Sequence, residues 1–264
     1  MPEGNEVHRF AERQSAIFTG KKVNIDSPNG RFLAGAEMLD GRKLRSIEAY
    51  GKHLGYDFGS DRMLHIHLGR YGDFWEGKMP YPEPKGALRM RLWTKTDWLE
   101  LRGASDCSVY TQEKWGKLLA RLGPDPLRDD DPEPAIEAIR QRKTAVGALL
   151  MEQSILAGIG NIYRAELLYR AKINPFRPGA EVGITDLKSI WREAKKLMRE
   201  GMVDRRIVTT RPKDRPHKKG TALREETHYV YRRAGKPCFV CGEKVLKQEM
   251  AGRTLYWCGT CQRT

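Results

Sequence analysis

The chain begins Met1-Pro2-Glu3-Gly4, and removal of Met1 would leave a secondary amine beside a carboxylate. A proline amine that attacks a carbonyl carbon cannot lose a second proton, so it forms a cationic iminium, which is a strong electron sink. The neighbouring Glu3 can move protons in such a reaction. The pair predicts covalent chemistry on a sugar aldehyde once Met1 has been removed. Proline is nevertheless common at position two of chains whose initiator methionine is trimmed, so this signal needs support from the rest of the sequence.

Four of the five cysteines form two C-x-x-C knuckles near the end of the chain. Four thiolates on two tight turns provide a closed tetrahedral shell, which is typical of a structural zinc and leaves no open position for catalysis. Disulfides are the alternative, which a cytosolic setting disfavours. The remaining Cys107 is expected in or near a buried core. The predicted zinc ligands are Cys238, Cys241, Cys258 and Cys261.

The net charge of +14 and the pI near 9.6 favour a polyanionic partner. Residues 199–236 carry twelve Lys or Arg against five Asp or Glu, a concentration that a solvated surface does not explain. Nucleic acid is the first candidate. An anionic membrane surface is the alternative, but no helical pattern combines a basic face with a bulky apolar one. Without an apolar run long enough to span a bilayer or to act as a signal peptide, the chain is expected in the cytosol.

The elements that must position these groups follow from the apolar patterns. Residues 5–19 predict an amphipathic helix that ends near Gly20. The following short alternating runs predict an antiparallel β-sandwich with basic residues on its solvent face. An acidic, proline-rich stretch at 129–134 is expected to separate this domain, residues 1–128, from a helical one. Strands are expected at residues 44–47, 53–58, 63–68, 88–92 and 98–102, and a short helix at 115–122.

The second half is helical in pattern, with apolar runs at 145–156, 163–169 and 187–198. Only Ala157-Gly158-Ile159-Gly160-Asn161 separates the first two, a turn that suits a DNA-binding helix-turn-helix variant because glycines let a phosphate approach the backbone amides. An ordinary helical corner is the alternative. We expect a helical domain at 135–228 and a zinc ribbon at 229–264. In the ribbon Arg253 lies at the expected hairpin tip, where it could reach a phosphate or remain solvated.

Taken together and in order, these motifs resemble the formamidopyrimidine-DNA glycosylase / endonuclease VIII family over the whole chain. The resemblance implies an α+β protein with an N-terminal antiparallel β-sandwich, a C-terminal helix-two-turn-helix and a four-cysteine zinc ribbon, with damaged DNA bound in the cleft between. The motifs are Pro2-Glu3-Gly4 with Glu6, Gly51-Lys52, His67-Leu68-Gly69-Arg70-Tyr71-Gly72, Leu122-Gly123-Pro124-Asp125-Pro126-Leu127, Gly158-Ile159-Gly160-Asn161 and the four cysteines.

The resemblance also implies roles. Pro2 would attack C1′ of the damaged nucleotide and expel the base, after which the iminium acidifies the sugar so that both flanking phosphates leave in turn. Glu3 would shuttle protons. Lys52 would hold a phosphate and help to protonate the leaving or ring oxygen. The family further implies one structural Zn²⁺, no catalytic metal or organic cofactor, a monomer, and a place in the bacterial cytosol or nucleoid.

The implied DNA contacts are Asn161 and Arg253 on the backbone around the lesion, and Arg70 with Tyr71 as the wedge that fills the gap left by the flipped base. Arg70 departs from the apolar wedge residue usual in the family, although a guanidinium plane can also stack. Asn5 replaces a proline often found in the opening motif.

Gly4 and Ala104-Ser105-Asp106 resemble the endonuclease VIII branch, and the arginine-phenylalanine wedge typical of the other branch is missing. Oxidised pyrimidines are therefore the first expected substrates, and oxidised purines such as formamidopyrimidines or 8-oxoguanine the alternative. A family relative that binds damaged DNA without turnover, and a zinc-ribbon factor that binds RNA, are the rival functions.

Some residues have plainer interpretations. Glu166 is expected to be structural, tying down the glycine turn, and Trp115 and Trp191 are expected in the core. His65 and His67 alternate on a strand, but no acidic or cysteine partner lies nearby in sequence, so metal binding is disfavoured.

Overall fold

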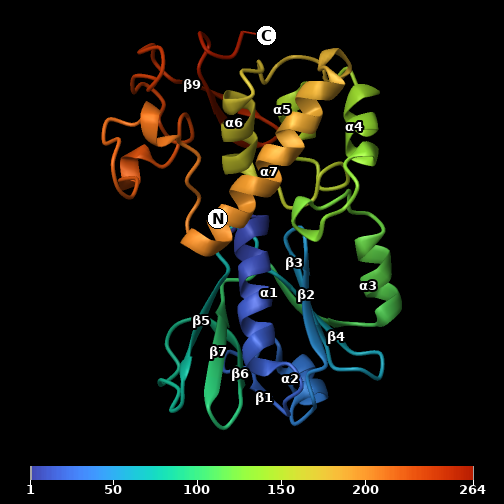
Figure 1. Ribbon diagram of the computed structural model, residues 1–264. Coiled ribbons are helices and arrows are strands. Elements are labelled where there is room, and N and C mark those ends of the chain that lie inside the picture. Colours follow the sequence, from blue (N-terminus) through green and yellow to red (C-terminus); the bar gives the residue numbers. More distant parts are fainter. Residues whose placement is uncertain (1, 264) are drawn as a thin grey trace. The chain divides into compact units, whose positions relative to one another are not determined.

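The computed structural model describes residues 2–263 (Figure 1). Met1, whose removal the proline chemistry requires, lies outside the described residues. The chain forms two compact units that meet in sequence between Arg121 and Leu122. The sequence suggested that the first domain extends to residue 128. In the structure residues 122–128 belong to the second unit, because Leu127 packs against the helical core.

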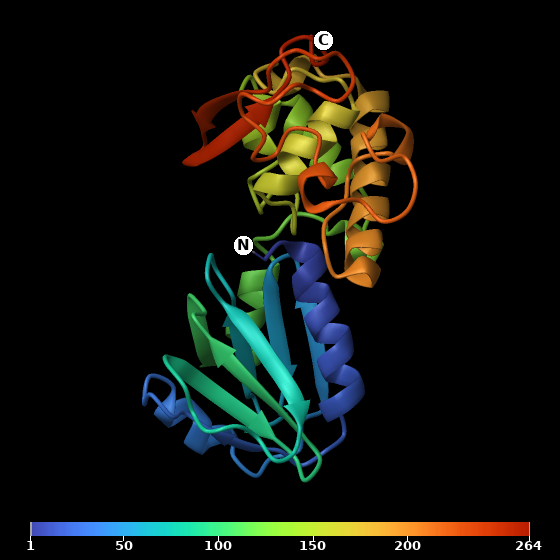
Figure 2. The ribbon, with the colours of Figure 1, turned by 90° about the vertical axis from the view of Figure 1, so that its left-hand side faces the viewer.

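Unit 1 is the predicted antiparallel β-sandwich (Figure 2). Its sheets have the strand orders β1-β6-β7-β5 and β2-β3-β4-β8, and their inward-facing apolar side chains form one core. Cys107 and Trp115 are buried as expected. The strands are β1 (Asn24–Asp26), β2 (Ser46–Tyr50), β3 (His53–Asp57), β4 (Met63–His67), β5 (Asp73–Lys78), β6 (Leu88–Trp93), β7 (Asp97–Arg102) and β8 (Asp106–Tyr110), and the helices α1 (Gly4–Phe18), α2 (Leu33–Leu39) and α3 (Gln112–Leu119).

The outer face of β6 is less exposed than its basic residues suggested. Arg91 is buried, and its guanidinium donates at 2.8 Å to the buried carboxylate of Glu100. The segment between β5 and β6 covers the pair, with the Tyr81 ring 4.1 Å from the Arg91 guanidinium. A buried arginine is tolerated here because its charge is paired and hydrogen-bonded.

Helix α1 buries one apolar stripe, which includes Val7, Phe10 and Phe18, and the chain leaves it through Gly20 in the left-handed region at φ +82°. Its C-terminal half lies beside the far part of β3, since Tyr56 Oη donates to the Gln14 side chain. The N-terminus of α1 therefore lies toward the end of the sheet that carries the β2–β3 turn, as Figure 1 shows.

Unit 2 has a helical core in which the buried Trp191 takes part, as predicted. The run 145–156 is helical only at α5, after which two hydrogen-bonded turns follow, closed by Glu152 N to Leu149 O at 3.1 Å and Leu156 N to Glu152 O at 3.0 Å. The backbone of 153–157 instead bonds to residues 123 and 124, which ends the helix early. The helices are α4 (Glu133–Arg140), α5 (Val146–Leu149), α6 (Asn161–Arg170) and α7 (Ile184–Asp204), with 3₁₀ turns η1 (Pro126–Arg128), η2 (Gly179–Glu181), η3 (Pro212–Asp214) and η4 (Arg224–Glu226).

The C-terminal segment ends in a hairpin of β9 (Leu246–Met250) and β10 (Arg253–Trp257). Its tip is the two-residue turn Ala251-Gly252, with φ +52° and +65°, values that match a type I′ turn. No helix within residues 2–263 is long and apolar enough to cross a membrane.

Candidate functional site

The register of the β2-β3-β4-β8 sheet gathers the predicted reactive residues of unit 1 at one end. Tyr50 pairs with His53, His53 with His67, and His67 with Asp106, so these residues form one row across the sheet. The turn that carries Lys52 and the loop that carries Arg70 and Tyr71 both begin beyond this row. The N-terminus of α1 lies at the same end (Figure 2).

Pro2 and Glu3 directly precede α1. Glu3 has extended backbone angles, and its carbonyl oxygen accepts from the amides of Glu6 and Val7, so it begins the helix. Its side chain is buried and does not cap the helix. The Glu3 carboxylate therefore takes no part in capping α1.

Lys52 occupies the second position of the two-residue turn between β2 and β3. Gly51 precedes it at φ +56°, which matches the first position of a type II′ turn and requires glycine or a similarly permissive residue. A two-residue turn has few allowed backbone conformations. The register of β2 and β3 therefore fixes the position of the Lys52 Cα atom.

Arg70 and Tyr71 lie at the tip of a tight loop between β4 and β5 that is closed by Gly72 N donating to Leu68 O at 2.9 Å. A Cβ at position 72 would lie 2.3 Å from that oxygen, so the closure requires glycine. Tyr71 is 76% exposed, and the Arg70 guanidinium carbon lies 5.5 Å from its ring centroid. The loop thus presents a stacked, exposed pair of planar groups.

In unit 2 the structure brings Asn161 and the hairpin tip together. Asn161 begins α6, is buried, and donates through its side-chain amide to the Thr254 carbonyl oxygen at 2.8 Å. Arg164, one turn along α6, donates to Met250 O at 3.1 Å. The two residues hold both sides of the turn, so the exposed Arg253 projects from a hairpin that is fixed on α6.

Gln153 is a residue that sequence analysis did not single out. Its side-chain oxygen accepts from Gly158 N at 3.1 Å, and its amide donates to Ile159 O at 2.9 Å. The Gln153 side chain therefore stabilises the glycine turn before α6 by bonding to two of its backbone groups. No local pattern predicts it, because its partners lie five and six residues away in an irregular segment.

The four ribbon cysteines converge. Their sulfur atoms all lie within 4.8 Å of one another, and all four are free thiols. Two of the separations are 3.9 Å (Cys238–Cys261) and 3.4 Å (Cys241–Cys258), close to the ~3.8 Å that tetrahedral coordination at ~2.3 Å requires. The cluster can hold a metal ion. Among the described residues it is the one group of His, Cys, Asp and Glu with this property, so His65 and His67 do not form part of such a group.

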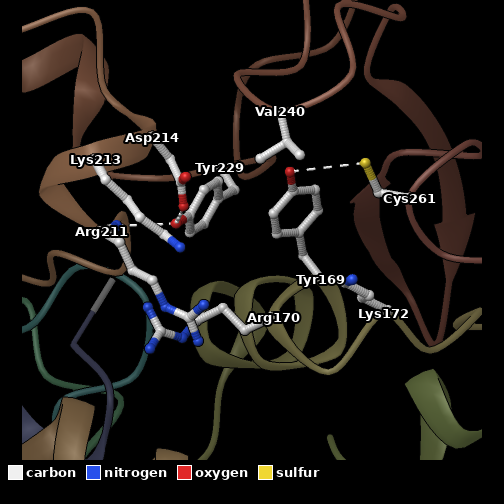
Figure 3. A pocket seen from close by; sticks show the side chains of 9 residues that line it. All are labelled: Tyr169, Arg170, Lys172, Arg211, Lys213, Asp214, Tyr229, Val240 and Cys261. Atoms are coloured by element: carbon white, nitrogen blue, oxygen red, sulfur yellow. Dashed lines mark hydrogen bonds between the residues drawn. The ribbon is translucent and has the colours of Figure 1, made fainter.

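Tyr169, at the far end of α6 from Asn161, supports this cluster. Its hydroxyl lies 3.1 Å from Cys238 Sγ. It also lies 4.0 Å from Cys261 Sγ, a contact that Figure 3 shows. Burial opposes ionisation of Cys238, but hydrogen bonds from Tyr169 and from the backbone outweigh it and lower the thiol pKa to about 7. A thiolate is the form that binds metal, so this hydroxyl favours metal binding.

The same tyrosine lines a pocket of about 190 Å³ beside the ribbon. Figure 3 shows Tyr229 there, whose hydroxyl donates to Asp214 at 2.6 Å and accepts from Arg211 N at 2.9 Å. The Tyr169 and Tyr229 rings stack at 4.5 Å. The pocket has four basic lining residues, but Arg170 is held by Glu193 at 2.6 Å, and the tyrosine hydroxyls are engaged. These contacts join the ribbon to α6.

Glu166 is structural, but it does not contact the glycine turn. The fully buried carboxylate accepts from the backbone amides of Tyr229, Val230 and Tyr231 at 2.7, 2.8 and 2.8 Å, and from the Thr209 hydroxyl. These partners lie 43 to 65 residues away in sequence. Glu166 therefore anchors the segment that leads into the ribbon.

Comparison with known proteins agrees with both units. Residues 1–105 match the formamidopyrimidine-DNA glycosylase N-terminal domain, and residues 122–212 match the H2TH domain of the same enzymes, which begins where unit 2 begins. The fold is also that of Lactococcus lactis Fpg in complex with DNA containing an abasic site, at a TM-score of 0.81 and 22% identity over 99% of this chain and 100% of the other.

The sequence relatives cover the whole chain. Endonuclease 8 1 of Mycobacterium tuberculosis is 40% identical over 99% of this chain and 100% of its own length. Endonuclease 8 of Pectobacterium carotovorum is 31% identical over 100% of both chains, and the formamidopyrimidine-DNA glycosylase of Thermus thermophilus is 29% identical over 99% and 98%. The chain therefore belongs to the formamidopyrimidine-DNA glycosylase and endonuclease 8 family of DNA repair enzymes, which are DNA glycosylases with AP lyase activity.

Proposed function

We propose that this chain excises oxidised bases from DNA, pyrimidines in preference, through a Schiff base with Pro2, and then cleaves the abasic site by β,δ-elimination. The observation that carries the proposal is the gathering of the α1 N-terminus, the Lys52 turn and the Arg70–Tyr71 loop at one end of unit 1. A nucleophile, a cation and a wedge are the parts that base removal from duplex DNA needs.

The Pro2 amine, released by removal of Met1, attacks C1′ of the damaged nucleotide, and the glycosidic bond breaks as the base leaves with a proton. Opening of the sugar ring, with a proton gained at O4′, gives the iminium. The iminium draws electrons from C2′, so loss of a C2′ proton expels the 3′ phosphate, and a further elimination expels the 5′ phosphate.

Glu3 gives the proton to O4′ and exchanges protons during elimination, since it is adjacent to the nucleophile and does not cap α1. Lys52 holds a phosphate oxygen and helps to protonate the leaving or ring oxygen. Its place in a two-residue turn supports this role, because a short turn aims the ammonium more narrowly than a long loop would.

Asn161 and Arg253 hold the DNA backbone around the lesion. In this assignment Asn161 acts partly through the hairpin, since its side chain bonds the residue after Arg253. The metal in the four-cysteine cluster is one structural Zn²⁺, which fits four thiolates and leaves no site for a substrate. The protein acts as a monomer on chromosomal DNA in the bacterial cytosol.

The proposed preference for pyrimidines rests on the similarity of this chain to the endonuclease 8 branch of the family. Endonuclease 8 1 of Mycobacterium tuberculosis is 40% identical, in line with Gly4 and Ala104-Ser105-Asp106, whereas further endonuclease 8 relatives at 29–31% lie level with a formamidopyrimidine-DNA glycosylase at 29%. Oxidised purines are the second candidate, because both matched domain families are described from formamidopyrimidine-DNA glycosylases. Duplexes that each contain one thymine glycol, dihydrouracil, 8-oxoguanine or formamidopyrimidine decide between them. Faster excision of the purine lesions would refute the preference for pyrimidines.

Borohydride trapping tests the mechanism. Protein with a confirmed Pro2 terminus should form a covalent adduct with an abasic-site duplex, Pro2→Gly should lose most activity, and Glu3→Gln should lose base excision more than abasic-site cleavage. Glu12→Gln, on an exposed position of α1, is the matched control. Absence of an adduct from correctly processed protein, or excision at the parent rate by both variants, would refute the proposal.

A further inference from the structure

Two histidines and an aspartate form a hydrogen-bonded chain across three neighbouring strands of unit 1. His53 Nδ1, on β3, lies 2.9 Å from His65 Nε2 on β4. His65 Nδ1 in turn lies 2.9 Å from Asp106 Oδ2 on β8. The residues are separated by 12 and 41 positions in sequence, so only the sheet register joins them.

The chain is buried at its middle residue, His65, whereas Asp106 is partly exposed. His65 is 3% exposed, with the Trp115 ring from α3 at 5.8 Å and the Tyr110 ring at 4.6 Å. The Asp106 carboxylate also accepts from the hydroxyls of Ser108 at 2.6 Å and Tyr110 at 3.0 Å. Three donors on one carboxylate fix its position, and the burial of His65 shields the histidine side of this contact from water.

The hydrogen-bond partners determine where the protons lie. Burial opposes ionisation of Asp106, but its hydrogen bonds to Ser108, Tyr110 and His65 outweigh this and hold its pKa below the usual range. Burial lowers the pKa of His65, and it lowers that of His53 to about 3. A neutral His65 must then donate from Nδ1 to Asp106 and accept at Nε2 from the Nδ1–H of His53. Asp106 thereby sets the tautomer of both rings.

The other end of the chain, His53, adjoins Lys52 in the sequence. His53 is the next residue, and it is the first of β3 after the two-residue turn. The His67 ring lies 4.8 Å from His53 between centroids, and the positive charge of Lys52 acts on both rings, lowering the pKa of each below what burial alone would give. His53 is thus held by a hydrogen bond on one side and borders the lysine on the other.

We propose that Asp106 and His65 are positioning residues for Lys52, which act by locking the ring of His53 in one tautomer and orientation at the base of the β2–β3 turn. The inference rests on the proposed function, because it assumes that Lys52 contacts the substrate. It adds to that function a set of residues that act through Lys52 and not on the substrate directly. An aspartate that fixes a histidine tautomer can affect rate strongly although it touches no substrate.

The test is a double-mutant cycle between Asp106→Asn and Lys52→Ala, read as single-turnover cleavage of an abasic-site duplex. The asparagine keeps the size of the side chain but removes its charge and one of its two acceptor oxygens, so the charge-assisted bond that anchors His65 becomes a weaker neutral bond or is lost. We expect Asp106→Asn to slow cleavage by about tenfold to a hundredfold, the range for a misplaced reactive group, with borohydride trapping on Pro2 retained. In the Lys52→Ala background, the same change should have no further effect, because the residue it positions is gone.

Ser108→Ala is the matched control, since it removes a different hydrogen bond from the same carboxylate and leaves the histidine chain intact. His65→Leu is the second variant, in case Asp106→Asn does not fold, and it should reproduce the loss. Thermal unfolding of each variant verifies that it is folded at the assay temperature.

Equal losses in the parent and Lys52→Ala backgrounds would mean a general structural effect and would overturn the inference. So would a parental rate for folded Asp106→Asn or His65→Leu. Failure of the parent protein itself to form an adduct would instead refute the proposed function, and this inference with it.

Discussion

The substitution Glu166→Gln should detach the ribbon from α6. It keeps the shape of the side chain and removes its charge. The parent carboxylate accepts from three backbone amides and one hydroxyl, and it has no exposed surface. Since a glutamine has one acceptor oxygen in place of two, it cannot serve all four donors.

The cost follows from the less damaging orientation of the glutamine. With its oxygen toward Val230 and Tyr231, the NH₂ group faces Thr209, whose hydroxyl can still donate to Thr227 O at 3.2 Å, while Tyr229 N loses its acceptor. An orphaned buried donor costs about 1–3 kcal/mol, and two charge-assisted bonds that become neutral lose about 0.5–1.5 kcal/mol each. The free energy of unfolding should therefore fall by about 2–6 kcal/mol, a large part of the total stability of an ordinary domain.

Urea unfolding of the metal-loaded protein, followed by tryptophan fluorescence and by metal release to a chromogenic chelator, measures this. With a slope of ~2 kcal/mol per molar urea, the midpoint should fall by about 1–3 M. Glu225→Gln, which removes an exposed carboxylate close by in sequence, is the control and should leave the midpoint unchanged. A loss below about 1 kcal/mol for Glu166→Gln would show that the carboxylate does not anchor the ribbon.

Three further predictions concern acid, metal and salt. The pKa of His53 is lowered from 6.5 to about 3, so the folded state binds fewer protons than the unfolded state between these values and stability falls as the pH drops below 6.5. Urea unfolding should give about 2 kcal/mol less stability at pH 5 than at pH 7 from this residue, and less of a difference in His53→Gln; equal pH dependence of the two proteins would contradict the assignment. Chelation should unfold the ribbon and expose it to proteolysis while unit 1 resists, with weaker DNA binding by fluorescence anisotropy; a chelated protein that binds DNA as tightly as before would exclude the ribbon as a contact. Arg253→Ala should weaken binding and lower the salt dependence of the affinity by about one phosphate contact, whereas the exposed Lys244→Ala should do neither, and an unchanged salt slope for Arg253→Ala would remove it from the interface.

Local sequence patterns predicted most elements of unit 1, because strand alternation and turn residues act over a few positions. The strands at 53–57 and 63–67 begin where the pattern placed them. The helix expected at 115–122 begins instead at Gln112, since Thr111 caps it by accepting from Lys114 N at 3.0 Å. That signal was local and was overlooked.

The run 145–156 shows where periodicity misleads. Its apolar residues are buried as a helix would bury them, but only 146–149 is helical. Two consecutive turns can direct apolar side chains to the same core, and the choice between turns and helix is made by backbone bonds to residues 123 and 124. A partner about thirty residues away leaves no trace in the local pattern.

The sequence by itself determined the four-cysteine cluster and the family, because paired cysteine knuckles and a series of short motifs carry their chemistry within a few residues of one another. Tertiary structure alone decided what supports those residues. Glu166 accepts hydrogen bonds from the backbone of residues 229–231, more than sixty positions away in sequence. Asp106 is linked to His53 through His65 only because three strands pair in one register. Hydrogen bonds of this kind depend on side chains that folding brings within 3 Å, and residue type at one position does not disclose its distant partner.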